Sequence, residues 1–231
     1  MIEAQSPTGN RLLDALQPAT RERYLGEAER VHLERGHVLF ASGAPISDVH
    51  FPIDCVCSFV LTLESGQSAE TATAGNEGMV GLGTVIGNAP NRSAIVQVPG
   101  AAWKLRAEAF RDALDTRAEF RDVMRRYVGY IFHFAQQSSA CNAYHSVEQR
   151  LARWLLMTHD RARSERFPIT QQILSEMVAA TRPRVAECLA RFRTAQLVDY
   201  GRGWLQVKDV VGLEKTSCEC YAFTRPGAAW A

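Results

Sequence analysis

Short stretches of β-branched and aromatic residues alternate with turn residues between Val31 and Arg106, and this alternation limits the possible folds more than any other feature. The stretches are VHLERG, HVLFASG, DVHFPIDCVCSFVLTLESG, SAETATAG, SAIVQV and AAWKL, separated by Gly, Pro, Asn and Asp. Several short strands at this spacing are typical of an antiparallel barrel or jelly roll. The N-terminal half is therefore expected to be a β-roll, flanked by helices at Arg11–Ala28 and Ala107–Ala113.

One long helix is predicted after the strands. From Arg117 to Ser138 the chain has no Pro and a single Gly, and apolar or small residues recur at intervals of 4, 3, 4, 3 and 4. This heptad spacing is the pattern with which a helix packs along a partner helix. The residues of this seam, predicted to form a dimer interface, are Phe120, Met124, Tyr127, Ile131, Phe134 and Ser138. The alternative interpretation is a single amphipathic helix that packs on its own core.

The polar run QQSSACNAY at 136–144 predicts a break after the long helix. A second helix, with its apolar residues on one face, is expected from about Ser146 to Arg161. Pro168 then prevents the chain from continuing as a helix, because proline disfavours the α conformation in the residue before it.

Two short helices and a hairpin are predicted towards the C-terminus. Thr170 can cap the first helix, over Gln171–Val178, and Thr181 can cap the second, which has a proline in its first turn. A hairpin with Arg202 at its tip is expected at Leu197–Val207. Two helices joined by a tight turn and followed by a hairpin describe a winged helix-turn-helix.

The charged residues are unevenly distributed. The 231-residue chain has a net charge of only +1, which taken alone argues against nucleic acid as a partner. However, residues 1–144 contain 13 basic and 16 acidic residues, whereas residues 145–231 contain 13 and 9. A basic C-terminal part behind an acidic N-terminal part is typical of a nucleic-acid module joined to another domain.

The composition and the N-terminus indicate a globular cytoplasmic protein. With 46% hydrophobic residues the chain can bury a core, and no run of about 18 apolar residues predicts a membrane span. The N-terminus lacks the basic and then apolar order of a secretory signal. We therefore expect a cytoplasmic location and no membrane partner.

The cysteines and histidines predict no metal site. Cys55-x-Cys57 suits two small apolar fillers of a strand better than ligands. Cys218-x-Cys220 lacks zinc-ligand spacing, and a redox pair with Cys141 is the alternative for these residues. The histidines are scattered and are expected on the surface or in the core; they are His32, His37, His50, His133, His145 and His159.

The order of these parts resembles the Crp/Fnr family of transcription regulators over nearly the full length. The resemblance is strongest in ITQQILSEMVAATRPRVAECLARFRTAQLVDYGRGWLQV, and HSVEQRLARWLL is similar to the helix that opens the family's DNA-binding domain. The resemblance implies an α+β fold, made of an N-terminal antiparallel, jelly-roll-like β-roll, a long dimerisation helix and a C-terminal winged helix-turn-helix. The implied domains are a cyclic-nucleotide-binding-like sensor at 1–116, a dimerisation helix and hinge at 117–144, a DNA-binding domain at 145–218 and a tail at 219–231.

The segment EGMVGLGTVIGNAPNRSAIVQ resembles the family's phosphate-binding cassette, with Gly81 at its glycine and Arg92-Ser93 at its Arg-Ser pair. An arginine fork with neighbouring N–H groups suits a cyclic phosphate. Leu82 stands where the family's glutamate accepts from a ribose hydroxyl, and losing such an acceptor costs about 1–3 kcal/mol. Ordinary cyclic AMP is therefore not the expected effector. Another small ligand, a structural Arg92 and an unoccupied pocket are the alternatives, and Gln136 is a further ligand-contact candidate.

The resemblance implies a homodimeric, sequence-specific DNA-binding transcription regulator, with DNA binding modulated by a small ligand. Its partner would be palindromic double-stranded DNA with half-sites about one helical turn apart. An activator would also need a surface for RNA polymerase. The residues implied to contact DNA are Thr170, Gln171, Thr181, Arg182, Arg184, Glu187, Arg191 and Arg202. Pro183 and Glu187 depart from the family's usual recognition-helix pattern, which predicts a different half-site.

Two other classes of protein compete with this interpretation. One is a ligand-binding or scaffold protein of the same fold that does not bind DNA. The other is a jelly-roll enzyme, which would need inward-facing metal ligands such as His-x-His with a distant Glu and His. The predicted strands contain no such pattern, and no nucleophile lies beside a base. No enzymatic activity is therefore expected.

Overall fold

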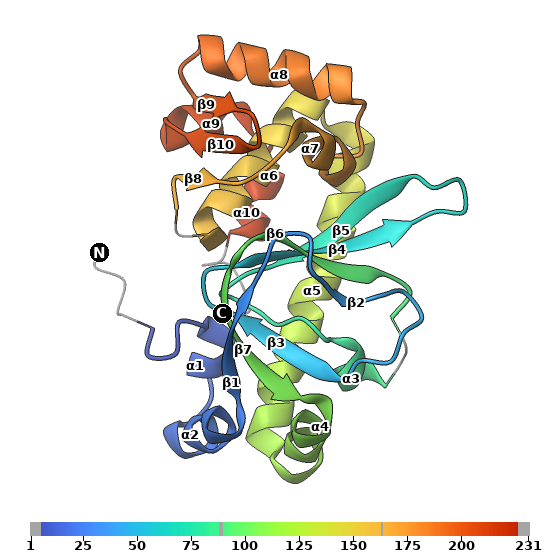
Figure 1. Ribbon diagram of the computed structural model, residues 1–231, viewed down its shortest axis with the longest axis vertical. Coiled ribbons are helices and arrows are strands. Elements are labelled where there is room, and N and C mark those ends of the chain that lie inside the picture. Colours follow the sequence, from blue (N-terminus) through green and yellow to red (C-terminus); the bar gives the residue numbers. More distant parts are fainter. Residues whose placement is uncertain (1–5, 88–89, 163, 226–231) are drawn as a thin grey trace. The chain divides into compact units, whose positions relative to one another are not determined.

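The computed structural model describes residues 6–87, 90–162 and 164–225 (Figure 1). The backbone groups into two compact units, the first made of residues up to 59 together with 73–131, and the second of residues 60–72 together with 132 onwards. The domain boundaries expected at 116, 144 and 218 stay predictions.

The first unit begins with two short helices where one was expected. They are α1 (Arg11–Asp14) and α2 (Pro18–Glu27). The Asn10 side chain caps α1 by accepting hydrogen bonds from the N–H groups of the next helical residues, and Pro18 occupies the first turn of α2. Because a helix seldom continues through a proline, the expected single helix at Arg11–Ala28 is divided at this point.

Seven strands of the β-roll follow the predicted order. They are β1 (Glu29–Leu33), β2 (Val38–Phe40), β3 (Asp48–Pro52), β4 (Val56–Thr62), β5 (Ser68–Ala74), β6 (Ser93–Val98) and β7 (Gly100–Arg106). One sheet has the order β1-β7-β3 and the other β2-β6-β4-β5. β7 pairs antiparallel with both β1 and β3. The expected β-roll is thus confirmed, with a short helix, α3 (Gly83–Ile86), between β5 and β6.

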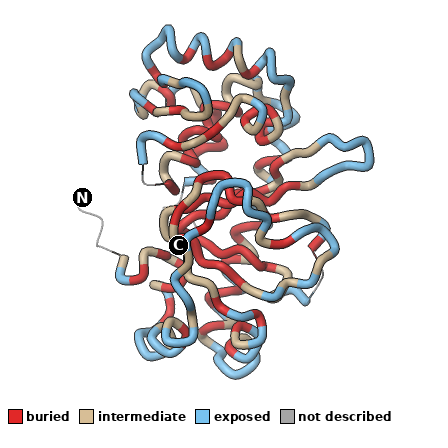
Figure 2. The backbone as a smooth tube through the Cα atoms, viewed as in Figure 1, coloured by how far each residue is buried: buried red, intermediate tan, exposed pale blue. Residues whose placement is uncertain are grey.

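Strands and helices both contribute buried residues to the first unit, and the segment 75–82 between β5 and β6 is buried as well, whereas the turns at 34–37 and 41–43 are exposed (Figure 2). Val49, Phe51 and Leu105 are buried on the sheet that contains β7. His50 is also buried, and its Nδ1 has no hydrogen-bond partner in the described chain. An imidazole in such a place is held neutral, because burial disfavours the charged form.

Acidification is expected to destabilise the first unit through His50. Burial lowers the pKa of His50 from 6.5 to about 4, with Asp48 opposing the shift. The unfolded chain therefore binds this proton below pH 6.5 while the folded chain does not, so stability present above pH 6.5 is lost as the pH falls towards 4. Between pH 7 and pH 4.5 the parent should lose about 2–3 kcal/mol more than His50→Leu in urea unfolding. Equal losses in both proteins would contradict this role.

A short and a long helix follow the β-roll. They are α4 (Ala107–Thr116) and α5 (Ala118–Tyr144), and the latter spans 27 residues. The polar break expected at 136–144 is wrong, because this run continues α5. Ser138 and Cys141 are small enough to be buried on the inner face of the helix, and tertiary packing of this kind overrides weak helix propensity.

The seam predicted as a dimer interface lies inside the chain. Phe120 packs against the rings of Tyr24 and Phe110, with 5.2 Å between centroids in each pair. The Tyr127 hydroxyl donates to the Met79 carbonyl at 3.0 Å. All six seam residues are buried, namely Phe120, Met124, Tyr127, Ile131, Phe134 and Ser138. Their assignment to a partner helix is therefore corrected: the heptad spacing marks the face of α5 that packs into its own chain.

The second unit contains the predicted helices and wing, and two further helices. They are α6 (Val147–Ala162), β8 (Arg166–Phe167), α7 (Gln171–Met177), α8 (Arg182–Thr194), β9 (Val198–Gly201), β10 (Trp204–Val207), α9 (Val210–Thr216) and α10 (Cys220–Thr224). The strands have the order β8-β10-β9. α6 packs against α8, α9 and α10. The expected winged helix-turn-helix is confirmed.

The C-terminal segment was expected to be a tail, but α10 is part of the core. Arg161 of α6 is fully buried and donates to the carbonyls of Met157 and Thr224, both at 3.0 Å. Cys220 and Tyr221 are buried as well. Residues 226–231 of the predicted tail lie outside the described residues. Within the described ranges, no helix is long and apolar enough to cross a membrane.

Candidate nucleic-acid interface

The turn between α7 and α8 fixes how the two helices meet. The Thr170 hydroxyl accepts a hydrogen bond from the N–H of Ile173 at 3.3 Å and caps α7, as expected. The turn is short because Ala179 adopts a left-handed conformation, with φ 47°. Thr181 occupies the N-cap position of α8, but its side chain makes no capping hydrogen bond. The expected cap is therefore absent, and Thr181 is exposed at the start of the helix.

α8 has one buried face and one exposed basic face. Val185, Leu189 and Phe192 are buried, as the apolar spacing predicts. The exposed positions include all five of the residues expected to contact DNA from this helix and its N-cap, namely Thr181, Arg182, Arg184, Glu187 and Arg191. Packing of the inner face therefore presents these side chains to solvent.

Most arginines of the exposed face are already paired within the chain. Arg184 forms an ion pair with Glu187, with 2.7 Å between Nη1 and Oε2. Arg191 pairs with Glu148 of α6 at 2.9 Å. Such contacts reduce the tendency of an arginine to bind another anion.

Arg193 is held even more firmly. Its guanidinium lies 3.6 Å from the centroid of the Tyr200 ring, donates to the Tyr200 carbonyl, and pairs with Asp199 at 3.2 Å. The contacts connect the end of α8 to β9. Arg193 thus fixes the wing against the helix.

Arg182 and Arg202 differ from these arginines. Neither makes an ion pair or a side-chain hydrogen bond within the described part of the chain. Both line the same hollow, of about 600 Å³, between α7, the beginning of α8 and the wing. Thr170 and Gln171 line it too. The structure therefore brings four of the eight predicted DNA-contacting residues together around one hollow, with two unpaired cations among them.

Sequence reasoning missed several residues of this hollow, among them Gln172, Tyr200 and Trp204. The Trp204 ring lies under the guanidinium of Arg166 at 3.9 Å. Aromatic residues in a basic hairpin are a signal that could have found them, because arginine stacks well on aromatic faces.

Two residues of the cassette in the β-roll have structural roles. Gly81 has φ 116°, and a Cβ at this position would lie 2.7 Å from Val49 Cγ1. The residue therefore has to be glycine whether or not a ligand binds. Leu82 is buried, so its side chain belongs to the core of the β-roll.

The arginine of the cassette contacts its own chain. Its guanidinium lies 5.4 Å from the centroid of the Phe59 ring and 3.4 Å from Asn91 Oδ1. Burial lowers the pKa of the Arg92 guanidinium. Ser93 Oγ accepts from the N–H of Ser42 at 3.2 Å. Residues 88–89 of the cassette lie outside the described residues, and the last candidate, Gln136, is exposed on α5.

The structure brings together Cys141, Cys218 and Cys220, for which a redox pair was the alternative interpretation, and adds His145, which the sequence left apart from them. Cys141 and His145 lie at the end of α5, and Cys218 and Cys220 lie just before and at the start of α10. Their sulfur and nitrogen atoms are all within 4.8 Å of one another. A hydrogen bond with Cys141 lowers the pKa of the Cys218 thiol to about 5 and raises the pKa of Cys141. The missed signal is Cys141-x₃-His145, whose spacing places two ligands on one helix face.

Comparison with known families agrees with this architecture. Residues 30–117 match the cyclic nucleotide-binding domain family, and residues 149–216 match the Crp-like helix-turn-helix domain family. No curated protein matches the sequence. Together these two matches cover more than half of the chain, which therefore belongs to the Crp/Fnr family of transcription regulators.

Solved structures share the fold at low sequence identity. A transcriptional regulator of the Crp/Fnr family from Eubacterium rectale is 14% identical, with a TM-score of 0.69 over 90% of this chain and 98% of that one. A Crp-family regulator from Thermus thermophilus is 16% identical, with a TM-score of 0.67 over 87% and 98%. The c-di-GMP responsive global regulator CLP of Xanthomonas campestris is 14% identical, with a TM-score of 0.64 over 84% and 100%.

Proposed function

We propose that the protein is a homodimeric regulator of transcription that binds palindromic double-stranded DNA through its winged helices. The observation that carries the proposal is that Arg182 and Arg202, which make no ion pair or side-chain hydrogen bond with any described residue, line one hollow between α7, α8 and the wing. A free guanidinium at the beginning of a recognition helix can bind guanine O6 and N7 with both of its arms. A second one at the wing tip can neutralise a phosphate.

The other predicted contacts have supporting roles in this proposal. Thr170 and Gln171, at the beginning of α7, are placed to contact phosphates, which position a protein without specifying sequence. Glu187 forms an ion pair with Arg184, so its carboxylate is not expected to contact a base by itself. Because the ion pair is exposed, phosphate can compete for Arg184 at little cost.

A dimer is proposed to form along the exposed face of α5. Phe132 is 61% exposed on this helix, although a large apolar side chain is usually covered. It lies on the face opposite to the buried seam, and a second α5 would cover it. Two-fold symmetry of such a dimer would give half-sites about one helical turn apart.

The β-roll is proposed to respond to a small molecule other than ordinary cyclic AMP. The buried Leu82 offers no acceptor for a ribose hydroxyl, so an effector of a different chemical class is expected. Because the proposed partner is chromosomal DNA, the proposed place of action is the cytoplasm. Contact with RNA polymerase belongs to this proposal only if the protein activates transcription.

Selection from random duplexes tests the DNA-binding function. Full-length protein should enrich a palindrome, and its affinity should fall as the salt concentration rises, with log K losing about 0.9 per phosphate contact for each tenfold increase in salt. Gel shifts at two or more salt concentrations measure this slope. No enrichment, together with no salt-dependent binding, would instead favour a ligand-binding or scaffold protein.

A further inference from the structure

We propose that Cys141, His145, Cys218 and Cys220 bind one Zn²⁺ ion per chain, which connects α10 to the end of α5. Together they offer three thiolates and one imidazole, a ligand set found in structural zinc sites. All four belong to the second unit of the chain. The proposal is independent of whether the protein binds DNA.

The distances between the ligand atoms fit one tetrahedral ion. The Sγ atoms of Cys141 and Cys218 are 3.5 Å apart, and so are Cys220 Sγ and His145 Nδ1. Zinc–sulfur bonds of about 2.3 Å in a tetrahedron separate the ligand atoms by roughly 3.8 Å. An iron–sulfur cluster of four irons binds each cysteine through a different iron, which requires wider spacing. The compact set therefore suits a single metal ion.

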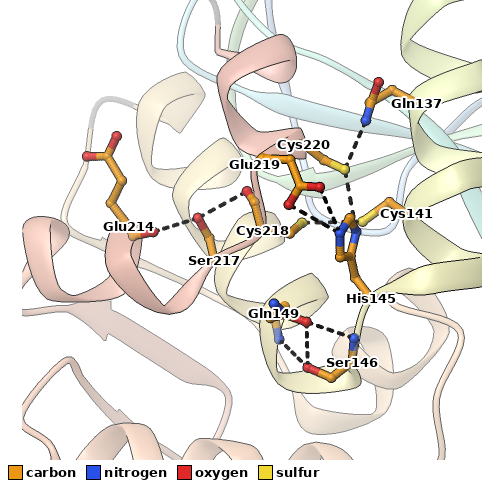
Figure 3. A network of polar contacts seen from close by, with 10 residues as sticks. All are labelled: Gln137, Cys141, His145, Ser146, Gln149, Glu214, Ser217, Cys218, Glu219 and Cys220. Carbon is orange, nitrogen blue, oxygen red and sulfur yellow. Dashed lines mark hydrogen bonds and ion pairs between the residues drawn. The ribbon is translucent and has the colours of Figure 1, made fainter.

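The local structure explains why these side chains converge. Cys141 and His145 are separated by about one helical turn, so both point from the same face of α5. Cys218 lies in the short connection that leads from α9 into α10, and Cys220 is the first residue of α10. Figure 3 shows the four side chains pointing towards one another from these two segments. The three cysteines are buried, whereas His145 is half-buried at the edge of the site.

Two neighbours are placed to orient the ligands (Figure 3). Glu219 lies 3.2 Å from His145 Nε2, so the Nε2–H can donate to the carboxylate while Nδ1 faces the thiols. This carboxylate–histidine pair is the usual support of a histidine that binds zinc. Gln137 Nε2 donates to Cys220 Sγ at 2.9 Å, a bond that holds this sulfur in place at the site.

A buried positive charge supplies an independent argument for an anionic site. Arg153 is only 7% exposed, and its Nε and Nη1 have no hydrogen-bond partner among the described residues. Its charge is close enough to interact with both Cys141 and Cys218. A buried cation without a counter-charge is costly. Zn²⁺ with three thiolates and a neutral imidazole has a net charge of −1, which would balance this arginine.

The same thiols could instead form a disulfide, and the geometry favours the metal. The Cys141–Cys218 sulfur separation of 3.5 Å is far from the roughly 2.05 Å of a disulfide bond. A disulfide would also leave Cys220 and the oriented His145 without a role. Oxidation to a disulfide is therefore treated as an outcome that would overturn the proposal.

Metal titration of the full-length protein tests the site. Reduced protein stripped with a chelator is titrated with Zn²⁺ in competition with a chromophoric chelator. The parent should bind one ion per chain, and Cys141→Ser and Cys218→Ser should bind at least 100-fold more weakly. Glu219→Gln should bind roughly 10-fold more weakly, because it keeps all four ligands but loses the support of the histidine. Cys188→Ser is the matched control, since Cys188 is a buried thiol of the same unit outside the cluster, and should bind like the parent.

Two further measurements keep the test decisive if a variant folds poorly. Co²⁺ bound to the parent should show the absorption of a tetrahedral, thiolate-rich site. Zn²⁺ should raise the Tm of the parent by about 5 °C or more and leave that of Cys141→Ser unchanged. The proposal is overturned if the parent binds no stoichiometric Zn²⁺, if Cys141→Ser binds as tightly as the parent, if the anaerobic protein holds iron with acid-labile sulfide, or if mass spectrometry of the protein as isolated finds a Cys141–Cys218 disulfide.

Discussion

Replacing Phe120 with alanine is expected to lower the free energy of unfolding by about 3–5 kcal/mol. The side chain is fully buried between the rings of Tyr24 and Phe110. Its removal would leave a cavity and end both aromatic contacts, while the neighbouring strands and helices restrict any collapse of the site. Urea unfolding followed by circular dichroism at a fixed protein concentration measures the loss.

Phe132→Ala is the matched variant, because it removes the same side chain from the exposed face of the same helix. Its stability should stay within about 1 kcal/mol of the parent. On the proposed dimer, Phe132→Ala should instead weaken association in analytical ultracentrifugation. If Phe120→Ala dissociates the dimer and leaves the unfolding of the chain unchanged, the buried seam would after all be the interface.

Arg182→Ala is expected to weaken binding to the selected palindrome by about 10- to 100-fold at matched salt. The parent side chain has no partner within the described chain, so it is free to bind a guanine edge. The variant should also lose its preference for one base pair in each half-site. Competition gel shifts with single-base variants of the palindrome measure both effects.

Variants of two other arginines distinguish the loss of a base contact from a general loss of positive charge in the same DNA-binding measurements. Arg202→Ala should weaken binding to all sequences about equally and reduce the salt slope by about 1, as expected for a phosphate contact. Arg184→Ala should have a smaller effect than Arg182→Ala, because Arg184 is paired with Glu187. Equal affinity of Arg182→Ala and the parent would show that Arg182 does not read a base.

The strands could be predicted from the sequence because each one is short and bounded by turn residues. β-branched residues between Gly, Pro and Asn leave few alternatives to a strand. The end of α5 could not be predicted in the same way. The Ser, Cys, Asn and Tyr residues that make up five of the nine positions of 136–144 have lower helix propensity than Ala or Gln, and the burial of Ser138 and Cys141 against the rest of the chain shows why the run is helical.

The heptad seam shows a different limit of sequence reasoning. Spacings of 4 and 3 identify the apolar face of a helix, but they do not identify what covers that face. In α5, residues of the same chain pack against the apolar face, as the contacts of Phe120 and Tyr127 show.

For a similar reason, the sequence predicted only part of each candidate site. Residue type and position indicated Arg182 on the recognition helix and Arg202 at the tip of the wing, but the pairing of Arg191 with Glu148 joins positions 43 residues apart. The four proposed zinc ligands likewise come from segments more than 70 residues apart. Such contacts depend on the fold as a whole, which no local pattern contains.

The buried guanidinium of Arg161 has a practical consequence for handling the protein. Its bond to the Thr224 carbonyl means that the last described helix completes the interior beside α6. A stop codon placed directly after the wing would not trim a loose end, because it would expose apolar surface and remove one of the acceptors of the buried Arg161. Affinity tags and fluorescent fusions are better attached after residue 225 through a flexible spacer, and shortened versions should retain α10.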